Sequence, residues 1–346
     1  MPAGSGVADV SVPVVPAQLR YRRLGAACVG LRRSRRGRWA LGAGTGVITL
    51  ALAALAARHF AAMSWPLSTR QPGLLVAAAL LLVLAQALKA FGWGRLFVPS
   101  ERPTPLALAA GNGGAALVGV LLPGRFDDAM RVAVVRRYPG CPAGVRVLCL
   151  SLVMLGLIDS VALAPLALAG AALPSVGAGV RAGLALVAAG GIAAAVLICL
   201  LPRLAASRWT LRFRLGRWVS PRTTSRRHAT EAWALVSACW LARAVAFFLL
   251  LAAFGVGYSF PLALLLLCAG AAAAALPVGL AGTATQVGAG GAALVATGVG
   301  TSQALHVAVS IGVLGVITGT AVLAAAVVWR SALSLLASRA GLKSFA

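Results

Sequence analysis

The densest cluster of polar side chains lies in the segment Pro123-Gly124-Arg125-Phe126-Asp127-Asp128-Ala129-Met130-Arg131. Two carboxylates, Asp127 and Asp128, stand beside two guanidinium groups, Arg125 and Arg131. Charged groups of both signs could together bind a zwitterionic or charged head group, because guanidinium pairs with carboxylate and phosphate through two parallel hydrogen bonds. The alternative is a solvated helix start, in which Asp127 and Asp128 interact favourably with the helix dipole.

Two further ionisable residues interrupt long apolar runs. Asp159 lies within LGLIDSVAL and Arg243 within CWLARAVAF. An ionisable group at membrane depth is costly unless it is paired or hydrated, so each of the two is a candidate functional residue. An ion pair between Asp159 and Arg243 is the simplest way to keep both, and we predict it. The alternative is that this buried pair has a purely structural role.

A glycine-rich segment, Leu276–Gly300, adds hydrogen-bonding groups through Thr283 and Gln286. Its glycines allow an unwound turn or a close approach of two backbones. No strand precedes the segment, so we do not expect a phosphate-binding loop. Further along, Gly315 and Gly319 have the G-x-x-x-G spacing that is typical of helix packing in membranes.

Composition places these residues in a membrane protein. Of the 346 residues 60% are hydrophobic and only 11% are charged, against about 25% charged in soluble domains. The net charge of +25 comes from Lys and Arg gathered between apolar runs, as the positive-inside rule requires of cytoplasmic loops. We therefore exclude nucleic acid as a partner and expect the Arg-rich loops to contact anionic lipid head groups.

Six apolar runs are long enough to cross a hydrocarbon core of about 30 Å. The predicted spans are Trp39–Ala57, Gly73–Phe91, Val147–Leu173, Ala182–Leu201, Ala232–Phe254 and His306–Trp329. The fold class predicted is thus an all-α, polytopic membrane bundle. Lys89, at the end of the second span, is assigned together with Arg95 and Arg102 to the cytoplasmic segment to which this span returns.

Two more apolar segments are interrupted. Thr104–Pro123 is expected to break at Gly111-Asn112-Gly113-Gly114 and, with basic residues on both flanks, to form a re-entrant hairpin from the cytoplasm. The segment 261–299 contains Pro277 and is expected to re-enter from outside. Such interruptions in corresponding places of two halves indicate an inverted repeat and a transport site. The alternative makes 261–277 and 282–299 two ordinary spans, which gives eight crossings.

The protein is expected in the plasma membrane, with its N- and C-termini both in the cytoplasm. Residues 1–38 are predicted to be a disordered, basic N-terminal segment, 39–330 the transmembrane bundle, and 331–346 a cytoplasmic tail. The long basic segment before the first span favours an uncleaved helix over a signal peptide.

Catalysis is not expected from the residues. The chain has six acids in total and no nucleophile–base–acid constellation. Its three histidines, His59, His228 and His306, lack metal-ligand spacing. We predict no cofactor and no metal, and the oligomeric state stays open.

The sequence LLPGRFDDAMRVAVVRR resembles the P-G-R-x-G-E-x-x-R signature of the lysylphosphatidylglycerol synthase transmembrane (flippase) family. The later stretch LPVGLAGTATQVGAGGAALVATGVGTSQAL resembles that family's second motif. The resemblance covers roughly residues 39–330. It implies a polytopic bundle that moves lipids or lipid-linked molecules between leaflets.

The departures from the family's motifs limit what the resemblance implies. Asp127 and Asp128 stand where the family has Gly-Glu, and Gly291 stands where a Glu is expected. The resemblance therefore does not extend to a cationic lipid substrate. With 346 residues the chain is not expected to hold the family's aminoacyl-transferase domain. We expect a flippase or transporter; the alternatives are a scaffold that recruits a cytoplasmic partner and a glycosyltransferase acting on lipid-linked sugars.

Overall fold

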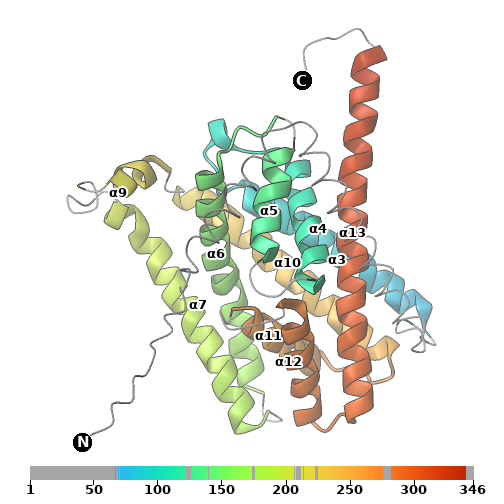
Figure 1. Ribbon diagram of the computed structural model, residues 1–346. Coiled ribbons are helices and arrows are strands. Elements are labelled where there is room, and N and C mark those ends of the chain that lie inside the picture. Colours follow the sequence, from blue (N-terminus) through green and yellow to red (C-terminus); the bar gives the residue numbers. More distant parts are fainter. Residues whose placement is uncertain are drawn as a thin grey trace, which may run out of the picture. The chain divides into compact units, whose positions relative to one another are not determined.

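The computed structural model describes residues 67, 69, 71–121, 126–138, 140–173, 176–205, 207, 212, 214–222, 225–275 and 282–339. All regular secondary structure in these residues is helical (Figure 1). The predicted helical membrane bundle is confirmed, and the chain is an integral membrane protein.

Five of the described helices are long and apolar enough to cross a membrane. They are α3 (Pro72–Gly94), α6 (Val145–Ala171), α7 (Ala178–Ala205), α10 (Arg226–Ala253) and α13 (Thr301–Arg339). Each matches one of the last five predicted spans, although α6 ends two residues and α10 one residue before the predicted end. The first predicted span, 39–57, lies outside the described residues. Helix α13 continues past residue 330, so the segment predicted as a tail is helical as far as Arg339.

The ends of these helices follow local sequence signals. Helix α3 begins with Pro72, which lacks a backbone N–H. In the first turn of a helix this N–H has no intrahelical acceptor, so no hydrogen bond is lost. The Ser225 hydroxyl caps α10 by accepting a hydrogen bond from the backbone N–H of His228. After α10, Gly255 has φ +75°, and the N–H of Val256 returns to the carbonyl of Leu251. This αL turn ends the helix.

The core is built by three packed helix pairs, α3 with α10, α6 with α7, and α4 (Pro105–Leu121) with α13. Trp93 of α3 is fully buried at its centre, and its indole N–H donates to the Ser151 hydroxyl of α6 over 2.9 Å. Gly191 of α7 lies so close to Ser160 and Ala164 of α6 that no Cβ would fit. Small residues thus let the backbones approach, as is common in membrane bundles.

Helices α4 and α5 (Phe126–Arg137) form an antiparallel pair, which we call the first hairpin. The predicted break at 111–114 is wrong, because α4 runs unbroken through these residues. Its glycines serve close packing instead. A Cβ on Gly111 would lie 2.7 Å from Val135 of α5, and a Cβ on Gly113 would lie 2.5 Å from the carbonyl oxygen of Gly319 in α13.

Helices α11 (Phe260–Ala275) and α12 (Gly282–Ala296) form the second hairpin. Contacts of Gly270 with Gln286 and of Gly290 with Leu266 show that the two helices run antiparallel. With 16 and 15 residues they are about 24 and about 22 Å long, short of a hydrocarbon core of about 30 Å. In the described residues, each of the two helices is thus shorter than an ordinary span. As in the first hairpin, the helix interiors are unbroken.

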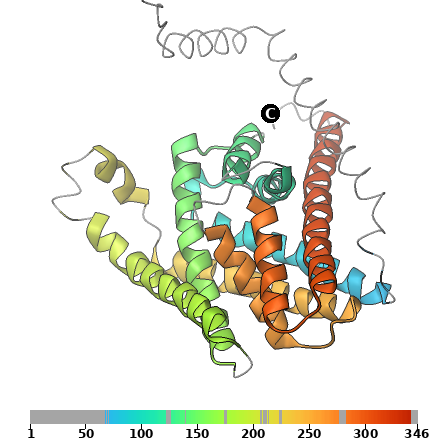
Figure 2. The same ribbon diagram turned by 60° about the horizontal axis from the view of Figure 1, so that its bottom comes forward.

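The two hairpins open at opposite ends of the bundle (Figures 1 and 2). The first follows the 3-10 helix η1 (Pro99–Glu101), which is ion-paired to η2 (Ser220–Arg222) just before α10 begins. The second follows directly where α10 ends. Since α10 runs from one end of the bundle to the other, the two hairpins begin at opposite ends of it, while their entry from opposite faces of the membrane stays a prediction.

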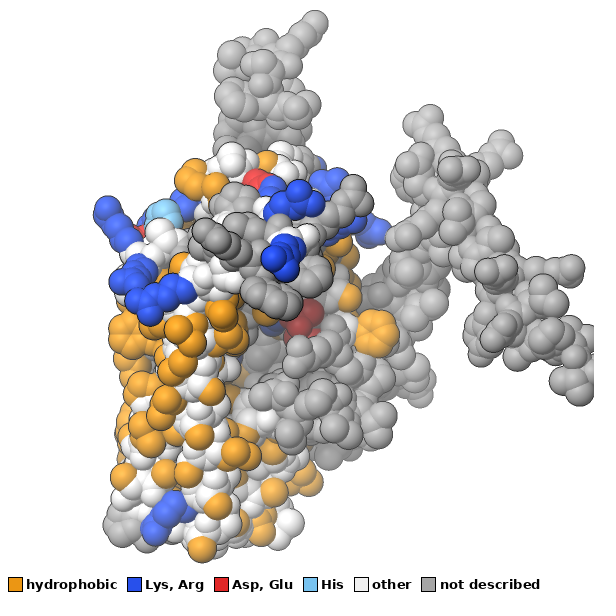
Figure 3. Space-filling model, turned by 90° about the vertical axis from the view of Figure 1, so that its left-hand side faces the viewer, with side chains coloured by type: hydrophobic (Ala, Val, Ile, Leu, Met, Phe, Trp, Pro, Cys, Tyr) orange, Lys and Arg blue, Asp and Glu red, His pale blue; other side chains and the backbone are white. Residues whose placement is uncertain are grey.

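Positive charge gathers at one end, which we call the basic end (Figure 3). It carries the start of α10, the end of α7 and the short helix α9 (Arg214–Val219). Helix α13 ends there too, because Arg330 lies over the ring of Tyr138 just after α5. Below the basic end the flank is apolar, with Leu186 of α7 exposed to 75%. A basic end above an apolar flank is typical of a membrane protein.

Candidate functional site

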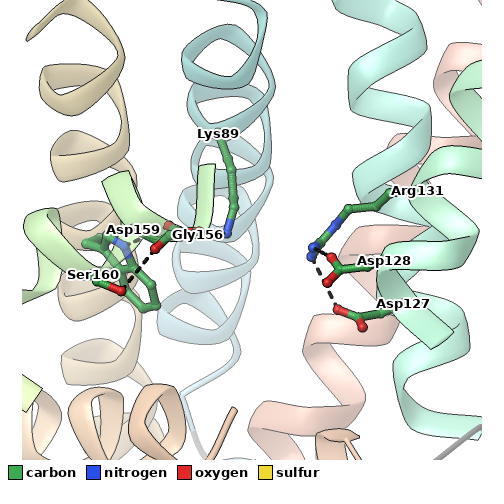
Figure 4. A network of polar contacts seen from close by, with 8 residues as sticks. Lys89, Asp127, Asp128, Arg131, Gly156, Asp159 and Ser160 are labelled. Atoms are coloured by element: carbon green, nitrogen blue, oxygen red, sulfur yellow. Dashed lines mark hydrogen bonds and ion pairs between the residues drawn. The ribbon is translucent and has the colours of Figure 1, made fainter. Parts of the chain in front are cut away.

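A buried ion pair joins α3 and α6 in the middle of the bundle. The Lys89 ammonium lies 2.7 Å from a carboxylate oxygen of Asp159, with side-chain exposures of 10% and 21% (Figure 4). The indole N–H of Trp240 in α10 donates to the other Asp159 oxygen over 3.1 Å. Three helices are thus tied together through one carboxylate. A charge at this depth is tolerated because it is paired and hydrogen-bonded.

The predicted pair of Asp159 with Arg243 is wrong. Asp159 is taken by Lys89 and Trp240, while the guanidinium carbon of Arg243 lies 5.2 Å from the Trp240 ring centre. This distance is within the range of a cation–π contact. Arg243 therefore belongs to the same cluster as Asp159, with Trp240 between them.

Lys89 was assigned from the sequence to a cytoplasmic segment, and this too is wrong. Helix α3 continues for more than a turn beyond it, to Gly94, and Lys89 is 8% exposed. The signal was present, because Lys89 is followed by the apolar residues Ala90 and Phe91 inside the predicted span. A lone Lys near the end of an apolar run can lie in the membrane when a buried carboxylate such as Asp159 is there to pair with it.

A second charged cluster lies on α5, near the turn of the first hairpin. Arg131 binds Asp128 at 2.6 Å and Asp127 at 3.6 Å. Asp127 and Asp128 also lie in the first turn of α5, where a carboxylate interacts favourably with the helix dipole, as the alternative interpretation of this segment predicts. Arg131 is 20% exposed and its Nε atom is buried without a hydrogen-bond partner. The fourth member of the predicted cluster, Arg125, lies outside the described residues.

The two clusters are neighbours across the bundle. A Cβ on Gly111 of α4 would lie 3.5 Å from the Trp93 ring and 3.4 Å from the carbonyl oxygen of Arg131. Lys89 is one helical turn from Trp93, so Lys89 and Arg131 lie at a similar depth. Figure 4 shows the Lys89–Asp159 pair on one side and the Arg131 cluster on the other at a similar height. The site therefore combines charges from α3, α5, α6 and α10.

In the described residues, the predicted polar residues of the second hairpin, Thr283 and Gln286, make no contact with the two charged clusters. Thr283 lies in the first turn of α12, and its side chain is outside the described part. Gln286 is exposed and makes no hydrogen bond within the described residues. Helix α12 does contact α4, so the two hairpins touch each other. Their role in a pathway remains a prediction.

The remaining acids of the described residues lie at the basic end. Glu101 of η1 receives two hydrogen bonds from Arg222, at 2.8 and 3.1 Å. Glu231 of α10 contacts Arg95 and Arg227. These pairs hold loops and helix ends together away from mid-bundle, and at side chains as exposed as Arg95 (45%) and Arg227 (87%) an ion pair contributes little to stability. They are therefore useful as controls for the charges at mid-bundle.

The geometry of the two mid-bundle clusters supports binding of a charged group more readily than bond-breaking chemistry. Asp159 is engaged by Lys89 and Trp240, and the carboxylates of α5 are engaged by Arg131, so neither is presented as a free general base. Guanidinium groups and tryptophan faces provide recognition of charge and shape. Compared with models of protein families, with curated proteins and with solved structures, this chain gives no match.

Proposed function

We propose that this protein carries a lipid or a lipid-linked molecule across a cell membrane, along a path that passes between the two hairpins. The observation that carries the proposal is the set of charged side chains at mid-bundle beside two hairpins that open at opposite ends. Transport sites commonly lie where elements in corresponding places of two halves of a bundle meet, and here the two hairpins contact each other through α4 and α12. Ionisable residues at membrane depth commonly mark substrate pathways.

The arrangement suggests how a polar head group would cross the apolar core. A head group that leaves the water loses hydration, and fixed charges at mid-depth can replace it. Arg131 near the turn of the first hairpin and Lys89 with Asp159 on the facing helices offer both signs of charge. The acyl chains would meanwhile stay in the lipid around the apolar helix flanks. This division suits a lipid better than a fully soluble substrate.

Neutralising the α5 cluster tests the proposal. The variant carrying Asp127→Asn, Asp128→Asn and Arg131→Gln removes three charges together, so no charge is left unpaired. In liposomes with a fluorescent phospholipid, bleaching of the outer leaflet by dithionite measures translocation. We expect the variant to translocate the probe at least about tenfold more slowly than the wild type, since charge-assisted contacts contribute about 1.5–3 kcal/mol each.

Arg227→Gln is the matched control, because this arginine is at the basic end and its side chain is 87% exposed. It should translocate at the wild-type rate. An unchanged rate in the triple variant would remove the α5 cluster from the path. If the wild type itself translocates no lipid, the scaffold alternative becomes the better explanation.

We also propose that the basic end faces the cytoplasm, in keeping with the positive-inside rule. Arg181 is exposed in the first turn of α7 at one end, and Arg217 of α9 is exposed at the basic end. In a background with all six cysteines replaced by Ala, Arg181→Cys should react with a membrane-impermeant maleimide on intact cells. Arg217→Cys should react only after permeabilisation, and the reverse pattern would invert the orientation.

A further inference from the structure

Among the described residues, one charge at mid-bundle has no carboxylate partner. The chain contains six acids, and five of them are in the described residues. All five are engaged by other cations: Glu101 by Arg222, Asp127 and Asp128 by Arg131, Asp159 by Lys89, and Glu231 by Arg95 and Arg227. The sixth, Asp9, is outside the described part. Arg243 makes no ion pair or hydrogen bond with any described residue, and its one specific contact is the Trp240 ring.

Arg243 faces the interior of the bundle. Leu241 and Val245 of α10 are 51% and 40% exposed, and each lies about 200° around the helix from Arg243. Cys239 and Leu250, which lie on the same face as Arg243, are buried at 1% and 0%. Arg243 itself is only half-buried, and none of its nitrogens is enclosed. Arg243 therefore lies on the inward face of α10, and its side chain is not fully enclosed.

The surroundings of Arg243 favour an anion. Lys89 lies 6.0 Å from the Trp240 ring centre on which Arg243 also stacks, so two cations share one aromatic residue. Asp159 neutralises only one of these charges. A guanidinium group offers two parallel N–H donors along one edge, and no described residue accepts a hydrogen bond from those of Arg243, whose central carbon lies 5.2 Å from the ring centre. A group with two oxygens in one plane, as in a phosphate diester, fits that edge.

We propose that Arg243 binds the phosphate group of a phospholipid head group in the interior of the bundle. The choice of a lipid as the ligand rests on the proposed function. The assignment narrows the substrate class to lipids that carry a phosphate. Phosphate is the anion that most membrane lipids have in common, and a site at mid-depth is reached by lipids that cross the bundle. Lys89 adds positive charge but stays bound to Asp159.

Ligand-dependent unfolding of purified protein in detergent tests the site. The probes are short-chain phosphatidylglycerol, the diacylglycerol with the same chains but no phosphate, and inorganic phosphate. Phosphatidylglycerol should raise the unfolding temperature of the wild type, and diacylglycerol should not. Arg243→Gln should weaken the apparent affinity for phosphatidylglycerol by about tenfold or more, with Arg243→Lys intermediate because it keeps the charge and loses the planar fork. Arg95→Gln, at the basic end, is the control and should bind as the wild type does.

Arg243→Gln also removes an uncompensated charge, so without ligand it should unfold at a temperature no lower than the wild type. A structural role would instead lower this temperature. Stabilisation by phosphatidylglycerol alone assigns the site to a lipid head group, and stabilisation by inorganic phosphate as well shows that the phosphate group suffices. Equal stabilisation by diacylglycerol, or undiminished affinity in Arg243→Gln, would overturn the proposal. Binding without translocation in liposomes would overturn the proposed transport while leaving this site in place.

Discussion

Replacement of Lys89 by Met is expected to lower the free energy of unfolding by about 3–5 kcal/mol, the usual penalty for breaking a buried ion pair from one side. The Asp159 carboxylate would keep only the Trp240 N–H as a partner in the middle of the membrane. The same reasoning predicts that Asp159→Asn is also destabilising, because the Lys89 ammonium is then left alone. Unfolding of purified protein in a mild detergent, followed by the accessibility of its buried cysteines, measures both changes.

The double variant Lys89→Met/Asp159→Asn separates charge from packing. With both charges gone, most of the lost stability should return, since a buried pair contributes less than either unpaired charge costs. Arg227→Met, at a side chain that is 87% exposed, should change stability little. If the double variant is as unstable as the sum of the single ones, Lys89 and Asp159 act through separate contacts and not as a pair.

Gly319→Leu is expected to separate α13 from the first hairpin. A Cβ on Gly319 would collide with the Cβ of Ala116, so even the smallest side chain forces the two helices apart. Overpacking of this kind costs about 1–3 kcal/mol in soluble cores, and here it also displaces the hairpin that carries Arg131. We expect both a lower unfolding temperature and a loss of lipid translocation.

Gly315→Leu is the matched control for Gly319→Leu. Gly315 is one turn away on the same helix and has open space where its Cβ would lie. Both variants change helix propensity equally, so the difference between them reports the contact with α4 alone. Equal effects of the two substitutions would mean that the α4–α13 contact is not tight in the working protein.

The spans were predictable because each apolar run had only one physical explanation. A stretch as long and apolar as Val147–Leu173 is not expected to be exposed to water, and its length matches the thickness of the hydrocarbon core. The second hairpin was also predictable, because Pro277 divides an apolar stretch that is otherwise too long for one span and short for two. The side of the membrane from which each hairpin enters stays a prediction, which rests on the basic flanks for the first hairpin and on the number of crossings for the second.

The interior of α4 could not be predicted in the same way. Glycine at 111, 113 and 114 is compatible both with an unwound turn and with close helix contact, and only the positions of Val135 and Gly319 decide between them. The partner of Asp159 is a similar case. The sequence can show that a buried carboxylate needs a cation as its partner. It does not show which, because in a helical bundle either Lys89 or Arg243 could lie next to Asp159. Which one lies opposite depends on how α3, α6 and α10 are rotated.

Helix α13 is longer than the membrane is thick. Its 39 residues span about 58 Å, roughly twice the hydrocarbon thickness of about 30 Å. Even a tilt of about 40°, at the upper limit for transmembrane helices, leaves a rise of about 45 Å. Its last turns therefore stand in water at the basic end, as a rod that projects from the bilayer. Shortening α13 from its C-terminal end would remove part of this rod before it removed any of the membrane span.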